Sequence, residues 1–287
     1  MVDDASTDDT GQRPREMQVE GLRVIRRKQS GPGGYAARNT GIGQARTPWI
    51  AFLDADDEWL PGHLARFESL HARFPEAVLL STSWRVEGAR AQRHANHYAA
   101  RYGEEGEHAL SLIHFITRWA SGYAPAWTSA ICVRTDIIRR VGGFPEGRCT
   151  RGGDVDTWLR VMLEGHMAAY SPEVSAVYHR DTGGSVTKRY RPQVNHCTSQ
   201  TVALAIESAR SWRLRHELRR LANMHKKDPM RKKARYEGLT WKDVSSLYPS
   251  ANPGFFLLAA GLRLLPRKLL TGVLTLRDRA VRVHSVL

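Results

Sequence analysis

Three features of the sequence predict an α/β fold: an open, mixed and mostly parallel sheet flanked by helices, followed by a basic helical extension. Compact apolar runs, of which residues 49–53 are the clearest, are typical of strands buried inside a sheet. Segments with apolar residues at helical spacing alternate with these runs. Of the net charge of +14, most lies in residues 200–287, which hold 18 Lys and Arg against 6 Asp and Glu. Residues 1–199 hold 25 against 23, so we expect one domain over residues 1–195 and a basic helical extension over 196–287.

The expected elements have local signals at their ends. The turn-forming residues 30–34 (SGPGG) precede a helix, and Pro61 lies where another helix can begin. Gly143 and Gly165 close two further helices. The polar residues 88–108 are expected to form a surface loop or a short helix. The expected strands are 22–25, 49–53, 78–83, 129–134 and 176–179, and the expected helices are 35–45, 64–74, 136–141, 156–163 and 201–223.

The composition argues against several classes of protein. The N-terminus (MVDDASTDD) is acidic, whereas a signal peptide begins with basic and then apolar residues. The longest apolar run, residues 255–262, is far shorter than the ~20 residues that cross a bilayer. The cysteines lack CxxC spacing, so a cysteine zinc site is not indicated. We therefore expect a cytoplasmic protein.

Three acidic clusters follow apolar or strand-like segments. They are VDDASTD from Val2, DADD from Asp54 and GDVDTWL from Gly153. Ligands of open α/β sheets bind outside the carboxyl ends of the strands. Carboxylates gathered there repel one another unless a cation shares the site. Oxygen ligands of this kind suit Mg²⁺ or Mn²⁺ together with substrate phosphates, so we expect a divalent metal and a diphosphate.

Two other interpretations compete with a metal site. Asp57 and Glu58, shortly before Pro61, could simply cap the following helix. Residues 31–36 (GPGGYA) satisfy the loose dinucleotide-binding pattern GxGxx(G/A), with Asp54 about 20 residues further on. A dinucleotide site would leave the remaining acids of the DADD cluster and both other acidic clusters without a role, so we favour the metal.

Four stretches, in this order, resemble a known family. They are VDDASTDDT, GPGGYAARNTGIGQARTPWIAFLDADDEWLP, VGGF and GGDVDTWLRV. Together they are similar to the GT-A-fold family 2 glycosyltransferases, from about residue 2 to about residue 190. The resemblance implies a nucleotide-diphosphate-sugar donor, Mg²⁺ or Mn²⁺, a glycan or lipid-linked glycan acceptor, and inversion at the anomeric carbon. It also implies a role in cell-surface polysaccharide or glycolipid synthesis.

The resemblance assigns roles to residues of the first two stretches. Asp3 and Asp4 match the acids that contact the base and the ribose, and Arg38 matches the Arg of the family's ARN segment near the nucleotide. Asp54 and Asp56 match the DxD pair. Asp54 is expected beside the nucleotide-sugar, and Asp56 is the likelier of the two to bind the metal directly.

The fourth stretch implies the catalytic base. Asp154 matches the base of the family's Glu-Asp motif, although Gly153 occupies the position of the Glu. Asp156 remains an alternative base, or a cap of the helix that it begins. A base is required because the acceptor hydroxyl loses its proton as it attacks the donor, and this needs a carboxylate away from the metal.

Three further residues are assigned by position only. His179 lies where some relatives place a third metal ligand or a phosphate contact, although a lone His at the end of a strand is more often structural. Trp127 and Ser129 fall where the acceptor pocket of the family would form.

The resemblance begins at the VDD turn, whereas family members begin with a strand, a helix and a second strand. We therefore expect an N-terminally incomplete domain that lacks its first strand and helix. Two functions follow: an inverting glycosyltransferase, or a catalytically silent remnant or nucleotide-sugar-binding protein of the same fold.

The basic extension has its own expected partner. Residues 226–233 are densely cationic, and residues 255–283 mix apolar and basic residues. Basic amphipathic helices bind anionic lipid surfaces, so peripheral attachment to the inner face of the cell membrane is one expectation for residues 226–283. A solvated helical face packed on the rest of the chain is the alternative. No motif indicates specific nucleic-acid binding.

Overall fold

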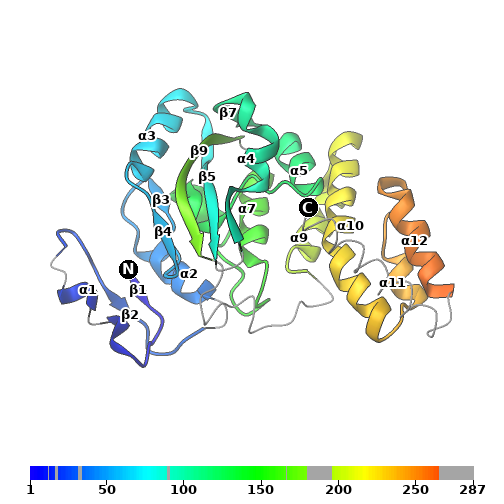
Figure 1. Ribbon diagram of the computed structural model, residues 1–287, viewed down its shortest axis with the longest axis horizontal. Coiled ribbons are helices and arrows are strands. Elements are labelled where there is room, and N and C mark those ends of the chain that lie inside the picture. The colour runs from blue at the N-terminus through cyan, green and yellow to red at the C-terminus, as the bar shows by residue number, and fades with distance from the viewer. Residues whose placement is uncertain are drawn as a thin grey trace. The chain divides into compact units, whose positions relative to one another are not determined.

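The structure is a computed structural model of the chain (Figure 1). It describes residues 1–11, 13–16, 19–31, 34–88, 91–165, 167–179 and 196–264. The chain divides into two compact units, Met1–Arg191 and Pro192–Leu287, which we call the first and second units.

The first unit is built on a mixed seven-stranded sheet, as the sequence predicts. Its central strands, β5 (Ala77–Gly88) and β9 (Met167–His179), run parallel to each other. The remaining strands pair antiparallel with their neighbours. The main path is β3-β8-β5-β9-β4, and the other strands are β3 (Trp49–Ala51), β4 (Asp57–Trp59), β6 (Ala91–Ala95), β7 (His108–Leu110) and β8 (Ile131–Arg134).

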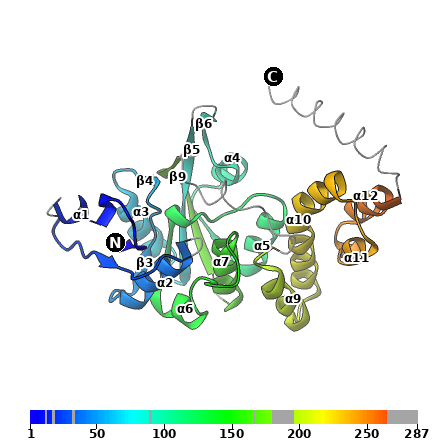
Figure 2. The same cartoon turned by 90° about the horizontal axis from the view of Figure 1, so that it is seen from below.

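Helices cover both faces of this sheet (Figure 2). On one face, Phe67 and Leu70 of α3 (His63–Arg73) pack on Leu80, Cys132 and Ala169 of three neighbouring strands. Alternate strand residues point to the opposite face, because successive side chains of a strand alternate. That face is covered by α5 (Leu112–Ala120), α6 (Thr135–Arg140) and α7 (Gly153–Leu163).

The start of the chain forms a small separate sheet. β1 (Val2–Asp3) pairs in parallel with β2 (Ile25–Arg26). Helix α2 (Tyr35–Gln44) lies beside β1, where Gly41 leaves room for the side chain of Val2. The unit also contains α1 (Arg13–Glu16), α4 (His97–Tyr102) and the 3₁₀ turns η1 (Asp9–Gly11), η3 (Gly103–Glu105) and η4 (Thr128–Ala130).

Two sequence-based expectations near the DADD cluster are wrong. Residues 49–51 were expected to be buried on both faces but are half-buried, because among the described strands β3 pairs only with β8 and lies at an edge. Asp57 and Glu58 do not cap a helix. They lie in β4, whose pairing with the distant strand β9 no local pattern reveals, and α3 begins only after Gly62.

The second unit contains helices only, within the part of it that the structure describes. These are α9 (Ser199–Ser208), α10 (Trp212–Tyr236), α11 (Trp241–Ser245), η5 (Pro249–Ala251) and α12 (Pro253–Leu264). The single helix expected over residues 201–223 is wrong, because the backbone becomes extended at Ala209. The apolar core of the unit consists of Met230, Ala234, Leu239, Val244, Leu247, Ala259 and Leu262.

Buried polar contacts complete the second unit. Asn223 of α10 donates a hydrogen bond to the carbonyl of Tyr248 (2.9 Å) and accepts one from its main-chain N–H (3.0 Å). Among the described helices of both units, none combines the length and apolar character needed to cross a membrane. Most of the amphipathic segment expected over 255–283 lies outside the described residues, which end at 264.

Candidate functional site

The DADD cluster forms the turn between β3 and β4. Ser129 of η4 holds this turn from beneath: its hydroxyl accepts a hydrogen bond from the main-chain N–H of Asp54 (3.1 Å) and donates one to Asp57 Oδ2 (2.6 Å). Ser129 is fully buried. Asp54 is half-buried and Asp56 is exposed. The turn therefore presents the Asp54 and Asp56 side chains outward and keeps Asp57 inside.

Asp57 is the most perturbed carboxyl group of the turn. Burial, followed by the neighbouring charges of Asp54 and Asp56, raises the pKa of Asp57 to about 7, although the hydrogen bond from Ser129 opposes this rise. The turn therefore gathers three carboxylates, of which Asp57 is largely withdrawn from water.

Arg38 supplies positive charge next to Asp54. Its guanidinium lies 2.5 Å from Asp54 Oδ1 and also stands over the ring of Phe144, 5.1 Å from the ring centroid. Burial by itself would lower the pKa of Arg38, but the charges of Asp54 and then Asp154 outweigh it and raise that pKa. Arg38 thus lies between carboxylates from two different elements, the β3–β4 turn and α7.

Asp3 and Asp4 face the strand that pairs with their own. The main-chain N–H of Ser6 donates to Asp3 Oδ1 (2.9 Å), and Arg26 lies 3.6 Å from the other oxygen of Asp3. Arg27 forms an ion pair with Asp4, and the N–H of Gly31 donates to Asp4 Oδ2 (3.1 Å). Arginines of the same chain therefore balance both predicted nucleotide-binding acids.

Asp154 lies in the first turn of α7 and is half-buried. It makes no hydrogen bond or ion pair with any residue that the structure describes. Its charge acts on Arg38 and on Tyr35, the first residue of α2. A half-buried carboxylate beside an arginine, without a hydrogen-bonding partner in the described chain, is available to accept a proton.

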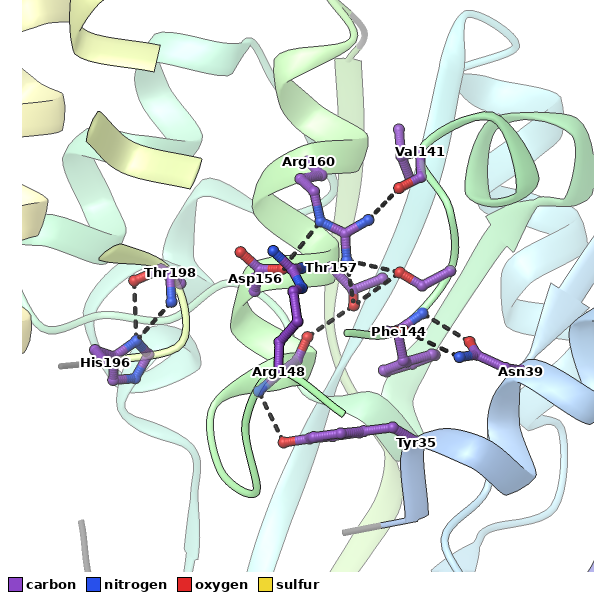
Figure 3. Close-up of polar contacts among 12 residues, drawn as sticks. Tyr35, Asn39, Val141, Phe144, Arg148, Asp156, Thr157, Arg160, His196 and Thr198 are labelled. Atoms are coloured by element: carbon purple, nitrogen blue, oxygen red, sulfur yellow. Dashed lines mark hydrogen bonds and ion pairs between the residues drawn. The ribbon is translucent and has the colours of Figure 1, made fainter. Parts of the chain in front are cut away.

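Asp156, the alternative base, has a different environment. It is fully buried, and its Oδ2 atom accepts from Arg148 (2.8 Å) and from Arg160 (2.9 Å) (Figure 3). Arg160 also donates to the carbonyls of Val141 and Gly143, the latter at 2.6 Å. Asp156 therefore ties α7 to the preceding loop, and its carboxylate is not accessible to an acceptor.

The remaining predicted residues lie at the far end of the turn. Trp127 packs against Trp84 and Tyr178, with both ring centroids 5.3 Å away. The ring of His179 lies 3.4 Å from Glu58 on its neighbouring strand. No group of three His, Cys, Asp or Glu residues close enough to bind a metal occurs among the described residues.

The donor set nevertheless fits a hard divalent cation. Mg²⁺ and its analogues need only one or two protein carboxylates when phosphates and water complete the coordination. Asp54 and Asp56 offer such oxygens, because Asp54 is half-buried and Asp56 is exposed on the same turn.

Residues 1–178 match the family model described as Glycosyl transferase family 2. These residues are more than half of the chain and include every predicted site residue except His179. The chain belongs to glycosyl transferase family 2.

Individual relatives cover shorter parts. The pre-mycofactocin glycosyltransferase of Mycobacterium tuberculosis is 33% identical over 153 residues, which are 51% of this chain and 30% of that protein. The succinoglycan biosynthesis protein ExoW of Rhizobium meliloti is 46% identical over 57 residues, which are 19% of this chain and 17% of that protein. The chain thus spans less than a third of the length of either relative.

Solved structures support the fold. Residues 1–349 of TarS from S. aureus, in complex with UDP-GlcNAc, match with a TM-score of 0.72 at 14% identity, over 94% of this chain and 80% of that one. The mannosyltransferase PcManGT from Pyrobaculum calidifontis, in complex with GDP-Man and Mn²⁺, matches with a TM-score of 0.54 at 19% identity, over 92% and 76%. The GT-A fold expected from the sequence is confirmed.

Two contributors to the site have no predicted role. Tyr35 contacts the start of α7, and Asn39 binds both the N–H and the carbonyl of Phe144 (2.7 and 3.0 Å). Both lie within four residues of Arg38 on α2, and the helix therefore brings them close to the site. Their partners are more than 100 residues away, and no local pattern identifies them.

Proposed function

We propose that this chain transfers a sugar from a nucleoside-diphosphate-sugar donor to a hydroxyl group, with inversion at the anomeric carbon. The observation that carries the proposal is the pairing of two unlike carboxylates around Arg38. Asp54 is bound to Arg38, whereas Asp154 faces Arg38 without a hydrogen-bonding partner among the described residues. Such a site offers an arginine that can meet the diphosphate and a separate carboxylate that can act as the base for the acceptor.

The proposed step is a single displacement. The acceptor oxygen forms a bond to the anomeric carbon while its proton passes to the carboxylate of Asp154. The bond between the anomeric carbon and the diphosphate oxygen breaks on the opposite side, and its electron pair leaves with the nucleoside diphosphate. The guanidinium of Arg38 stabilises the negative charge that grows on this leaving group.

The DxD pair would hold a divalent cation in this proposal. Asp56 is the direct ligand and Asp54 supports it, because both project from the same turn. Mg²⁺ or Mn²⁺, when bound, supplies Lewis-acid stabilisation of the departing diphosphate. His179 is the weakest candidate ligand, since its ring pairs with Glu58.

The donor and acceptor subsites follow from position. Asp3 and Asp4 would receive the base and ribose, and Arg26 and Arg27 then compete for the same oxygens. The exposed part of Trp127 would form the acceptor side, while Ser129 acts from beneath by holding the turn. The name of ExoW refers to succinoglycan biosynthesis, and we extend that context, cell-surface polysaccharide or glycolipid synthesis, to this chain.

The test compares binding and turnover in one series. Thermal unfolding with UDP-, GDP- and TDP-sugars, each with and without Mn²⁺, should identify one donor class that raises the midpoint only with the metal. Asp154→Asn should bind this donor normally but release nucleoside diphosphate at least about 100-fold more slowly, because general bases typically contribute that much. Asp136→Asn, a change to an exposed carboxylate on α6, is the matched control.

Two results would contradict the proposal. Donor binding without any turnover by the wild-type chain would indicate the catalytically silent nucleotide-sugar-binding protein. Unchanged turnover in Asp154→Asn would show that Asp154 is not the base.

We further propose that the second unit binds anionic lipid surfaces. Its described helices expose large apolar side chains, namely Trp212, Tyr236, Trp241, Leu257 and Leu258, and α10 also carries the cationic segment over residues 226–233. Amphipathic aromatic and basic residues are the side chains that favour a lipid interface.

Vesicle sedimentation tests this second proposal. The chain should bind vesicles of mixed phosphatidylglycerol and phosphatidylcholine, and the bound fraction should fall at high salt. Lys227→Glu with Lys232→Glu should weaken binding at least about tenfold, at about 1 kcal/mol for each charge near the surface. The control is Arg46→Glu with Arg101→Glu, two exposed positions of the first unit. Equal binding to vesicles of phosphatidylcholine alone would contradict the proposed attraction between the basic residues and anionic lipid.

A further inference from the structure

The side chain of Tyr35, at the start of α2, contacts the first turn of α7. The main-chain N–H of Gly153 donates a hydrogen bond to the hydroxyl oxygen of Tyr35 (2.8 Å), which Figure 3 shows reaching from α2. N–H groups at the start of a helix have no partner within the helix. Tyr35 therefore supplies the partner for the residue immediately before Asp154.

Gly153 is a glycine because Tyr35 occupies the space of a side chain there. A Cβ atom at this position would lie 2.5 Å from Cζ of Tyr35 and 2.8 Å from Cε2 of the same ring. It would also lie 2.8 Å from Cγ of Pro145. The backbone at Gly153 does not have the positive φ that favours glycine, so the requirement is one of space.

The ring of Tyr35 is held in place from its other side. It stacks on Phe144, with the ring centroids 6.1 Å apart and an interplanar angle of 11°. Phe144 is fixed in turn by the two hydrogen bonds that its main chain makes with Asn39. Because Tyr35, Arg38 and Asn39 all lie on the first turns of α2, this helix contacts the acidic turn and the base-bearing helix together.

Tyr35 is suited to a positioning role and not to proton transfer. Burial, and to a lesser extent the charge of Asp154, raise the pKa of Tyr35 to about 12, so its hydroxyl stays neutral over the physiological range. A neutral hydroxyl accepts the hydrogen bond of Gly153 at every pH at which the chain is folded and active.

We propose that Tyr35 is the residue that positions Asp154 for catalysis, by occupying the side-chain space at Gly153 and fixing the start of α7. This inference rests on the proposed function, in which Asp154 is the base. It also accounts for the missing Glu of the family's Glu-Asp motif: the tyrosine from α2 fills the space in which a side chain at 153 would begin.

A cycle of variants tests the role of Tyr35. Gly153→Ala should displace the ring or the helix start and lower kcat by about 100-fold, the cost typical of a misplacement of about 1 Å, while the donor Kd stays within about twofold. Tyr35→Ala should lower kcat similarly. Adding Gly153→Ala to Tyr35→Ala should then cost less than about threefold more, because the obstructing ring is gone.

A second variant separates the hydrogen bond from the space that the ring fills. Tyr35→Phe keeps the ring and removes only the acceptor oxygen, so the amide of Gly153 should exchange with solvent faster and kcat should fall by about tenfold. Matched controls are Gly43→Ala, where an added Cβ meets nothing within 4 Å, and Tyr98→Phe, which removes a hydroxyl whose partners, His108 and Arg118, lie outside α7. Both controls should keep wild-type kcat.

The outcomes are distinguishable. The inference is overturned if the wild type turns over donor and Gly153→Ala retains its kcat, or if Gly153→Ala lowers kcat equally with and without the Tyr35 ring. Weaker donor binding (a higher donor Kd) with unchanged kcat would also overturn it, because that pattern indicates a purely structural role. Failure of the proposed function is a separate result, in which the wild type releases no nucleoside diphosphate from any donor.

Discussion

At the residue scale, two carboxylates separated by one residue on α7 have opposite environments. Asp156 is fully buried between Arg148 and Arg160, whereas Asp154 has no hydrogen bond or ion pair among the described residues. Asp156 is closed to solvent and bound by two guanidinium groups, so its oxygens cannot meet an acceptor hydroxyl. The geometry therefore favours Asp154 as the base.

Asp156→Asn should destabilise the first unit without a specific effect on chemistry. Removing this buried charge leaves Arg160, whose side chain is only 17% exposed, without its counter-ion, which should lower the free energy of unfolding by about 3 kcal/mol. Denaturant unfolding measures the loss. Asp136→Asn, which breaks an exposed pair with Arg134, should cost less than about 1 kcal/mol. Equal losses in the two variants would contradict the structural role of Asp156.

The sequence predicted a set of site acids but not the residues that contact them. Asp54, Asp56 and Asp154 were predicted through their resemblance to family motifs, and each lies on a turn or at a helix start near the Arg38 helix. The distinction between Asp154 and Asp156 depends on Arg148, a loop residue that no periodicity places. Asp57 was wrongly predicted to cap a helix. Its contact with Ser129, which is 72 residues away, leaves no signal in the local sequence.

At the scale of single elements, local signals predicted where helices occur better than where strands end. The helices expected over 35–45 and 64–74 correspond closely to α2 and α3, because turn residues and apolar spacing act within one element. Strand β4 and the edge position of β3 depend on pairing with β9 and β8, which are distant in sequence. The break between α9 and α10 occurs at a residue with no glycine or proline nearby to signal it.

The start of α3 predicts a pH dependence of stability. His63 Nδ1 lies 2.7 Å from Ser175 Oγ and 3.0 Å from the Ser175 carbonyl on β9, and burial lowers the pKa of His63 from 6.5 to about 4. The folded chain therefore keeps His63 neutral while the unfolded chain binds a proton below pH 6.5. Stability should be fully present above this pH and fall progressively between about 6.5 and 4, by on the order of 2 kcal/mol.

The measurement is the free energy of unfolding as a function of pH. His63→Asn keeps a polar group facing Ser175 but cannot titrate, so its stability should change less than that of the wild type over this pH range. His71→Asn, at an exposed position of the same helix, should retain the wild-type slope. A wild-type slope in His63→Asn would show that other groups cause the pH dependence.

At the scale of the whole molecule, the two units have different characters. The first unit carries the family match and every candidate site residue, in an almost neutral sequence. The second unit holds 18 Lys and Arg against 6 Asp and Glu, which is most of the net charge of +14, and its described helices have an apolar core of their own. The charge asymmetry of the sequence predicts a domain boundary near residue 195, and this boundary stays a prediction.

A glycosyltransferase whose base is Asp154 should lose turnover when this carboxylate is removed. The decisive measurement is the rate of nucleoside diphosphate release at saturating donor, acceptor and Mn²⁺, compared between the wild type and Asp154→Asn. We expect a loss of about 100-fold or more in kcat with an unchanged donor Kd. Equal rates in the two proteins, or no release by the wild type, would contradict it.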